Sequence, residues 1–148
     1  MPRKLPAELA EIVRQRARFL CEYCHTDERW QCVRFTIDHF VPITEGGEDR
    51  PDNLALACFH CNRRKSDRQN AADTLNGHIV PLFNPRQDNW AQHFIWSGNG
   101  RLIIPLTATG RATAELLQFN RERLQEIRAA DFIIDRHPPL EDPLQPVG

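Results

Sequence analysis

At 148 residues, the chain has room for one domain or for two small lobes. Its formal net charge is −1, so it lacks the strongly basic balance of many nucleic-acid-binding proteins, and any such contact has to come from a local basic cluster. No uncharged apolar run approaches the roughly 18 residues that a membrane-spanning helix needs, so we expect no membrane partner.

Residues 6–20 have the periodicity of an amphipathic helix, and we expect its apolar stripe to be buried. The stripe consists of Leu9, Ile12, Val13, Ala17 and Leu20. Three arginines of this segment either face solvent or contact nucleic acid: Arg14, Arg16 and Arg18.

Two Cys-x-x-Cys pairs follow, Cys21 with Cys24 and Cys58 with Cys61. Zinc prefers four thiolate or imidazole ligands in a tetrahedron, and a two-residue spacer lets both sulfurs of a tight turn reach one ion. The two pairs therefore predict a structural zinc site. Because four thiolates leave no open position on the ion, any chemistry has to come from other residues.

The alternatives for these cysteines are disulfides or buried free thiols. The first six residues contain no apolar segment typical of a signal peptide, so we expect a reducing compartment, the cytoplasm, in which disulfides are disfavoured. Cys32 has no partner at the same spacing and is expected to be a small core residue. His25 and His60 could each replace a thiolate, although four cysteines make this unnecessary.

The interval between the pairs contains residues suited to catalysis. An apolar-rich run over residues 35–37 predicts a strand, and it ends in Asp38 and His39. Residues 44–49 include two glycines and predict a turn-rich loop. Asn53 precedes a second short apolar segment, residues 54–57.

Asn62 directly follows the second cysteine pair, and the polar run from Arg63 to Ala72 predicts a helix. The Asn62 amide would then lie near a helix N-terminus, where a phosphate can bind. This helix carries the densest basic cluster of the chain, which contacts phosphates or forms a solvated face: Arg63, Arg64, Lys65 and Arg68.

The order of five motifs in this chain resembles that of an HNH endonuclease of the zinc-stapled type. The motifs are Cys-x-x-Cys, Ile-Asp-His-x-x-Pro, Gly-Gly, Asp-Asn-Leu and Cys-x-x-Cys-Asn-x-x-Lys-Ser-Asp. The resemblance covers about a third of the chain, Cys21 to Arg68. It implies an α+β fold: a treble-clef-like ββα-metal finger with a structural four-cysteine zinc, preceded by an N-terminal helix and followed by a β-hairpin and C-terminal helices.

The resemblance also implies roles. His39 matches the general base, and Asp38 matches the carboxylate that binds the catalytic cation. Asn53 matches the central asparagine, which orients the histidine and stiffens the loop. Asn62 takes the last position, where histidine is more usual, so the chain is an H-N-N variant; its hard amide oxygen favours Mg(II) or Mn(II). His60 is the other candidate for this third position.

The implied activity is metal-dependent hydrolysis of DNA phosphodiester bonds, leaving 5′-phosphate and 3′-hydroxyl ends. The alternative is a non-catalytic zinc-knuckle module that binds nucleic acid or protein. The sequence does not indicate an oligomeric state.

The second half of the chain is expected to pack on the finger, with domain limits at 1–74 and 75–136 and a flexible tail over 137–148. We predict an extended connector over 79–85, a helical turn over 88–93 and a hairpin over 94–106. Two helices are expected to follow, one capped by Thr109 and ending at Phe119, the other capped by Asn120 and ending near Phe132. Their buried residues are expected to be Leu116, Phe119, Leu124 and Ile127.

Residues 83–114 resemble a tail found on a group of prokaryotic HNH proteins. Its Arg86, Trp90 and His93 could form a second site. The simpler interpretation is that Trp90, Phe94 and Trp96 cover the open side of the finger and that His93 caps or packs.

Overall fold

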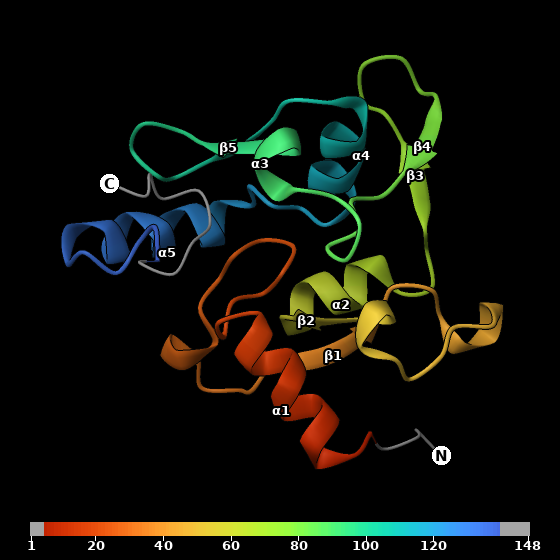
Figure 1. The fold of residues 1–148 in the computed structure, drawn as a ribbon. Coiled ribbons are helices and arrows are strands. Elements are labelled where there is room, and N and C mark those ends of the chain that lie inside the picture. Colours follow the sequence, from red (N-terminus) through yellow and green to blue (C-terminus); the bar gives the residue numbers. More distant parts are fainter. Residues whose placement is uncertain (1–4, 140–148) are drawn as a thin grey trace. The chain divides into compact units, whose positions relative to one another are not determined.

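The structure is a computed structural model that describes residues 5–139. The chain forms two compact units that divide between Arg68 and Gln69. In Figure 1 the colours run from red to yellow-green through the first unit and from green to blue through the second. The sequence places this boundary after residue 74 because it predicts a helix through Ala72. The packing of residues 75–136 on the finger stays a prediction.

The first unit begins with helix α1, Ala7–Arg16, which confirms the predicted N-terminal helix but ends earlier. It ends because Arg18 and Phe19 have positive φ values of 55° and 62°, which lie outside the helical region. Val13 is fully buried, whereas Ile12 is 54% exposed, so the predicted burial of Ile12 is wrong. Successive helical residues point about 100° apart, and only one of these two faces the core.

Two arginines hold α1 on the rest of the unit. The Arg14 guanidinium donates a hydrogen bond of 2.8 Å to the Phe35 carbonyl. The Arg16 guanidinium donates to the Pro51 carbonyl at 2.8 Å and to the Leu54 carbonyl at 2.6 Å. These two side chains, considered above for nucleic-acid contact, therefore serve to attach the helix.

The centre of the first unit is an antiparallel hairpin followed by a helix. Strand β1, Thr36–His39, pairs with β2, Leu54–Ala57, and every residue of β2 is buried. Helix α2, Phe59–Lys65, packs against both strands (Figure 1). The order strand, strand, helix confirms the predicted α+β fold with a ββα finger.

Helix α2 ends at Lys65, and its predicted extension to Ala72 is wrong. Ser66 has a φ of 53°, which interrupts the helix. Strand β3, Asn70–Ala72, then pairs with β4, Ile79–Pro81, in the second unit. The polar composition of this stretch favours a helix locally, but strand pairing with a distant segment overrides it.

The loop between β1 and β2 depends on its two glycines. Gly46 has a φ of 88°, a conformation that glycine adopts without strain. At Gly47, an added Cβ would lie 1.7 Å from the Val41 carbonyl oxygen, so no side chain fits. The described part of this unit, residues 5–68, also has three short 3-10 helices: η1 Glu28–Trp30, η2 Ile43–Glu45 and η3 Pro51–Asn53.

Between residues 69 and 139, the second unit contains two hairpins and three helices. Beside β3 and β4, its elements are α3 Trp90–His93, β5 Phe94–Trp96, β6 Ile103–Pro105, α4 Ala108–Leu116 and α5 Glu122–Ile133. The antiparallel pair β5–β6 confirms the predicted hairpin. Helix α4 is capped by Thr107 and not by Thr109, because the Thr107 hydroxyl accepts the Gly110 N–H. The Asn120 side chain does not cap α5; it pairs with the backbone of Ile103.

The core of the second unit is an aromatic cluster. The rings of Trp90 and Phe94 are 5.0 Å apart, and Phe94 also contacts Phe83 and Phe119. Trp90 and Phe94 thus pack within their own unit. Ile127 is 37% exposed, so its predicted burial is wrong.

The first residue of the predicted tail is attached to the hairpin. A His137 ring nitrogen lies 2.7 Å from the Gly100 carbonyl oxygen, and the ring packs edge-on against Trp96 at 4.5 Å. Residues 140–148 of the predicted tail lie outside the described residues. Within residues 5–139, the helices are too short or too polar to cross a membrane.

Candidate active site

Four cysteines converge at one point of the first unit. The sulfur atoms of Cys21, Cys24, Cys58 and Cys61 lie within 4.8 Å of one another, and all four residues are buried. The Cys24 and Cys58 sulfurs are 3.8 Å apart. A tetrahedral zinc with Zn–S bonds of about 2.3 Å requires sulfur separations of about 3.8 Å. The predicted cluster therefore has the composition and dimensions of a structural zinc site.

The electrostatics of the cluster also favour a bound cation. Hydrogen bonds from Cys21, Cys58 and Cys61 lower the pKa of Cys24 well below its usual value. Burial raises the pKa of Cys21, and the hydrogen bond with Cys21 raises that of Cys61. The four buried sulfurs cannot all be ionised side by side unless a positive ion compensates their charge, and a zinc ion would supply that charge.

The other candidate ligands lie outside this cluster. Cys32 is exposed, so its predicted core position is wrong: it lies in an irregular loop between η1 and β1. His25 is buried with a φ of 59°, and its N–H closes the first knuckle turn on the Cys21 carbonyl. His60 lies on the first turn of α2, beside the cluster.

A pocket of about 320 Å³ opens at the end of the β1–β2 hairpin. Asp38 and His39 reach it from β1, and Asn62 reaches it from α2. The structure therefore brings together three of the four residues predicted for catalysis. Six further residues line the pocket: Ile37, Pro42, Ile43, Thr44, Ser66 and Asp67. Sequence reasoning did not single out the exposed carboxylate of Asp67.

Asp38 is 4% exposed and is held from inside the unit. The Tyr23 hydroxyl donates a hydrogen bond of 2.6 Å to its Oδ2 atom. Burial, together with the adjacent Asp38 carboxylate, raises the pKa of Tyr23 well above its usual value, so the phenol keeps its proton and remains a donor. Tyr23 lies between the two cysteines of the first pair. The sequence pattern indicates a role for these cysteines but none for the tyrosine between them.

His39 has an acidic partner that sequence reasoning also missed. Its Nε2 atom lies 2.7 Å from Oδ1 of Asp49, which belongs to the loop after the two glycines. A carboxylate accepts hydrogen bonds and does not donate them, so Nε2 carries the proton in this contact. The Nδ1 atom of the neutral ring is then the hydrogen-bond acceptor.

Asn53 braces the loop that carries Asp49. Its side-chain oxygen accepts the Val41 N–H at 2.8 Å, and its amide group donates to the carbonyls of Val41 at 3.0 Å and Glu48 at 3.1 Å. These bonds connect both ends of the loop. In the described part of the chain, the His39 ring donates its hydrogen bond to Asp49 and not to Asn53, so any effect of Asn53 on the histidine passes through the loop.

Lys65 differs from the other basic candidates. Its side chain is fully buried, donates to the Phe40 carbonyl at 3.1 Å and lies 3.4 Å from Asp38 Oδ2. A phosphate cannot reach it, so its predicted phosphate contact is wrong. Arg63 and Arg68 are exposed near the end of α2, and Arg64 is half-buried.

Residues 21–68 match the family model described as HNH endonuclease. The match begins at the first cysteine of the four-sulfur cluster and includes all the pocket residues named above. The chain carries an HNH endonuclease domain. Comparison with curated proteins and with solved structures gave no match.

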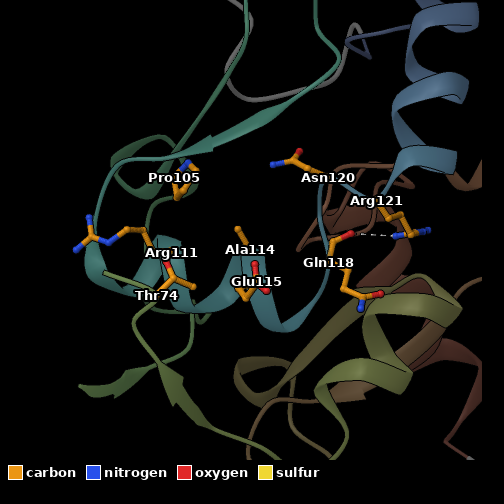
Figure 2. A pocket seen from close by; sticks show the side chains of 8 residues that line it. All are labelled: Thr74, Pro105, Arg111, Ala114, Glu115, Gln118, Asn120 and Arg121. Carbon is orange, nitrogen blue, oxygen red and sulfur yellow. Dashed lines mark hydrogen bonds between the residues drawn. The ribbon is translucent and has the colours of Figure 1, made fainter. Parts of the chain in front are cut away.

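A second cavity, of about 440 Å³, lies in the second unit, outside the HNH domain (Figure 2). Its residues are Thr74, Pro105, Arg111, Ala114, Glu115, Gln118, Asn120 and Arg121. The Arg111 guanidinium forms two hydrogen bonds, of 2.8 and 2.9 Å, with Asp73 and lowers the pKa of that carboxyl to about 2. Because Asp73 already neutralises Arg111, and Asn120 is bonded to Ile103, the main polar groups of this cavity serve the fold.

The proposed second site around His93 is also accounted for by packing. A His93 ring nitrogen lies 2.6 Å from the hydroxyl of Thr107, the cap of α4, and the ring contacts Phe83 edge-on. Trp90 belongs to the aromatic core. The geometry thus agrees with the expected packing role of His93, whereas the covering of the finger by Trp90, Phe94 and Trp96 stays a prediction.

Proposed function

We propose that the chain is a metal-dependent endonuclease that hydrolyses DNA phosphodiester bonds in the pocket of its HNH domain. The observation that carries this proposal is the position of Asp38, His39 and Asn62 around one pocket. A base and two oxygen ligands on a single concave surface can act on the same phosphate.

His39 is the proposed general base. With the proton on Nε2 and Asp49 accepting it, Nδ1 is left to take a proton from the attacking water. Asp49 also stabilises the imidazolium that forms when this proton arrives, because its carboxylate is 2.7 Å away. Asp49 is therefore a proposed positioning residue, and Asn53 holds its loop through Val41 and Glu48.

Asp38 and Asn62 are the proposed ligands of a catalytic cation. The donors are a carboxylate and an amide oxygen, and such hard ligands suit Mg(II) or Mn(II). When bound there, the cation supplies Lewis-acid stabilisation of the phosphate and of the leaving 3′-oxygen. Hydrolysis of this kind leaves a 5′-phosphate and a 3′-hydroxyl.

The proposed DNA contacts are the arginines at the end of α2, Arg63, Arg64 and Arg68. Arg63 and Arg64 lie on the same short helix as Asn62, and Arg68 follows the end of this helix by three residues, so a strand held by them passes near the pocket. A four-thiolate zinc site also fits a reducing compartment, for which we propose the cytoplasm.

A plasmid assay tests the proposed function. Zinc-loaded protein, freed of other divalent ions by dialysis, is incubated with supercoiled plasmid with and without added Mg(II) or Mn(II). We expect open-circular or linear products only with the added ion. Retarded but uncut plasmid under every condition would instead support the non-catalytic binding module.

A further inference from the structure

The two oxygens of the Asp38 carboxylate have different surroundings. Oδ2 accepts the Tyr23 hydroxyl at 2.6 Å and lies 3.4 Å from the Lys65 ammonium nitrogen. Within residues 5–139, Oδ1 has no hydrogen bond or ion pair of its own. Asp38 also lines the pocket that holds His39 and Asn62. One oxygen is therefore held from inside, and the other is left for a ligand.

Both groups that hold Oδ2 come from the segments that carry the cysteine cluster. Tyr23 lies between Cys21 and Cys24, and Lys65 lies one turn of α2 after Cys61. Neither side chain has room to move away from the Asp38 carboxylate. Tyr23 and Lys65 are both fully buried, and the Lys65 nitrogen also lies 4.9 Å from the centre of the Phe40 ring.

We propose that Tyr23 and Lys65 are positioning residues that fix Asp38 through Oδ2, so that Oδ1 alone is presented to the catalytic cation, and that they couple the cysteine cluster to the cation site. This inference rests on the proposed function, in which Asp38 is a cation ligand. The zinc cluster then does more than hold the fold together: it sets the orientation of a ligand in the neighbouring site.

The physical reason is the rotational freedom of a carboxylate. Without Oδ2 contacts, the Asp38 group can turn about its terminal torsion and bind a cation through both oxygens or through neither. A charge-assisted hydrogen bond as short as 2.6 Å restricts this rotation strongly. Partners of metal ligands typically contribute about 10- to 100-fold to metal affinity or activity.

Binding of Mn(II), followed by the loss of the free-ion EPR signal, tests the coupling without any substrate. Tyr23→Phe removes only the hydroxyl and keeps the ring, and we expect about tenfold weaker binding at unchanged zinc content. Glu28→Gln is the matched control. It alters another buried contact of the same unit, the 2.6 Å hydrogen bond from the Phe35 N–H, but Glu28 does not line the pocket, so native affinity is expected.

Asp38→Asn separates the two proposals. If it binds Mn(II) as the native chain does, Asp38 is not a ligand and the proposed function loses its cation site. If Asp38→Asn binds weakly while Tyr23→Phe binds with native affinity, the cation site stands and the positioning role of Tyr23 is overturned.

A second measurement applies even where Tyr23→Phe fails to fold. Tyr23 is the only tyrosine of the chain, so incorporation of 3-fluorotyrosine labels this position alone. We expect the single ¹⁹F resonance to shift when Mg(II) is added to the zinc-loaded protein and to stay unchanged in Asp38→Asn. A resonance that saturating Mg(II) does not move in the native chain would overturn the coupling.

Discussion

Replacing Cys58 with serine is expected to release the zinc ion and unfold the first unit. Zinc binding contributes about 10–16 kcal/mol to folding in zinc-finger peptides. A typical domain is stable by about 5–15 kcal/mol in total, so loss of the ion removes the margin of a unit this small. Cys58 is doubly important here, because its sulfur also caps α2 by accepting the Cys61 N–H.

Zinc content and hydrogen exchange together measure this effect. The native chain should hold about one zinc per molecule, and Cys58→Ser should hold almost none. Amides of β1 and β2 should lose their protection from exchange in the variant. Cys32→Ser is the matched control, because Cys32 is exposed and outside the cluster. A Cys58→Ser protein that keeps its zinc and its protected hairpin would contradict the four-thiolate site.

Replacing His39 with alanine is expected to lower the rate of DNA cleavage by about 10²- to 10⁴-fold, the usual contribution of a general base. The fold should survive, since the side chain is only partly buried and zinc binding does not involve it. Asp49→Asn should cause a smaller loss. An amide can still contact the ring, but it no longer stabilises the imidazolium or selects the tautomer with a free Nδ1.

Single-turnover cleavage of a labelled duplex with Mg(II) measures these rates. His78→Ala serves as the control, because His78 is an exposed loop residue of the second unit. Zinc content must match the native value in every variant. His39→Ala with a native cleavage rate would remove His39 as the base, whatever the metal dependence.

The sequence predicted the residues whose spacing is set by a local requirement. Two cysteines separated by two residues can reach one ion from a single tight turn, so the pairs that begin at Cys21 and Cys58 are recognisable without a structure. Asp38, His39 and Asn62 each adjoin a predicted element, and the resemblance to HNH endonucleases implies their roles. By contrast, Tyr23 contacts Asp38 across 15 positions, and Asp49 contacts His39 across ten, and no local pattern encodes such contacts.

The errors have similar origins. Lys65 is predicted to contact phosphate because it belongs to a cluster of basic residues, whereas its place on the inner face of α2 buries it against Phe40 and Asp38. The predicted helix through Ala72 failed because pairing of β3 with β4 is non-local. Cys32 is predicted to be a core residue from its residue type alone. Its position in an exposed loop outweighs the general preference of cysteine for burial.

The most direct test of the central claim is a crystal of the native chain grown with Mn(II), with anomalous scattering recorded to locate the ion. We predict a manganese peak in the pocket of the first unit, in contact with Asp38 Oδ1 and the Asn62 side-chain oxygen and adjacent to the His39 ring. A pocket with no manganese under saturating ion, or a peak bound to other residues, would contradict the account.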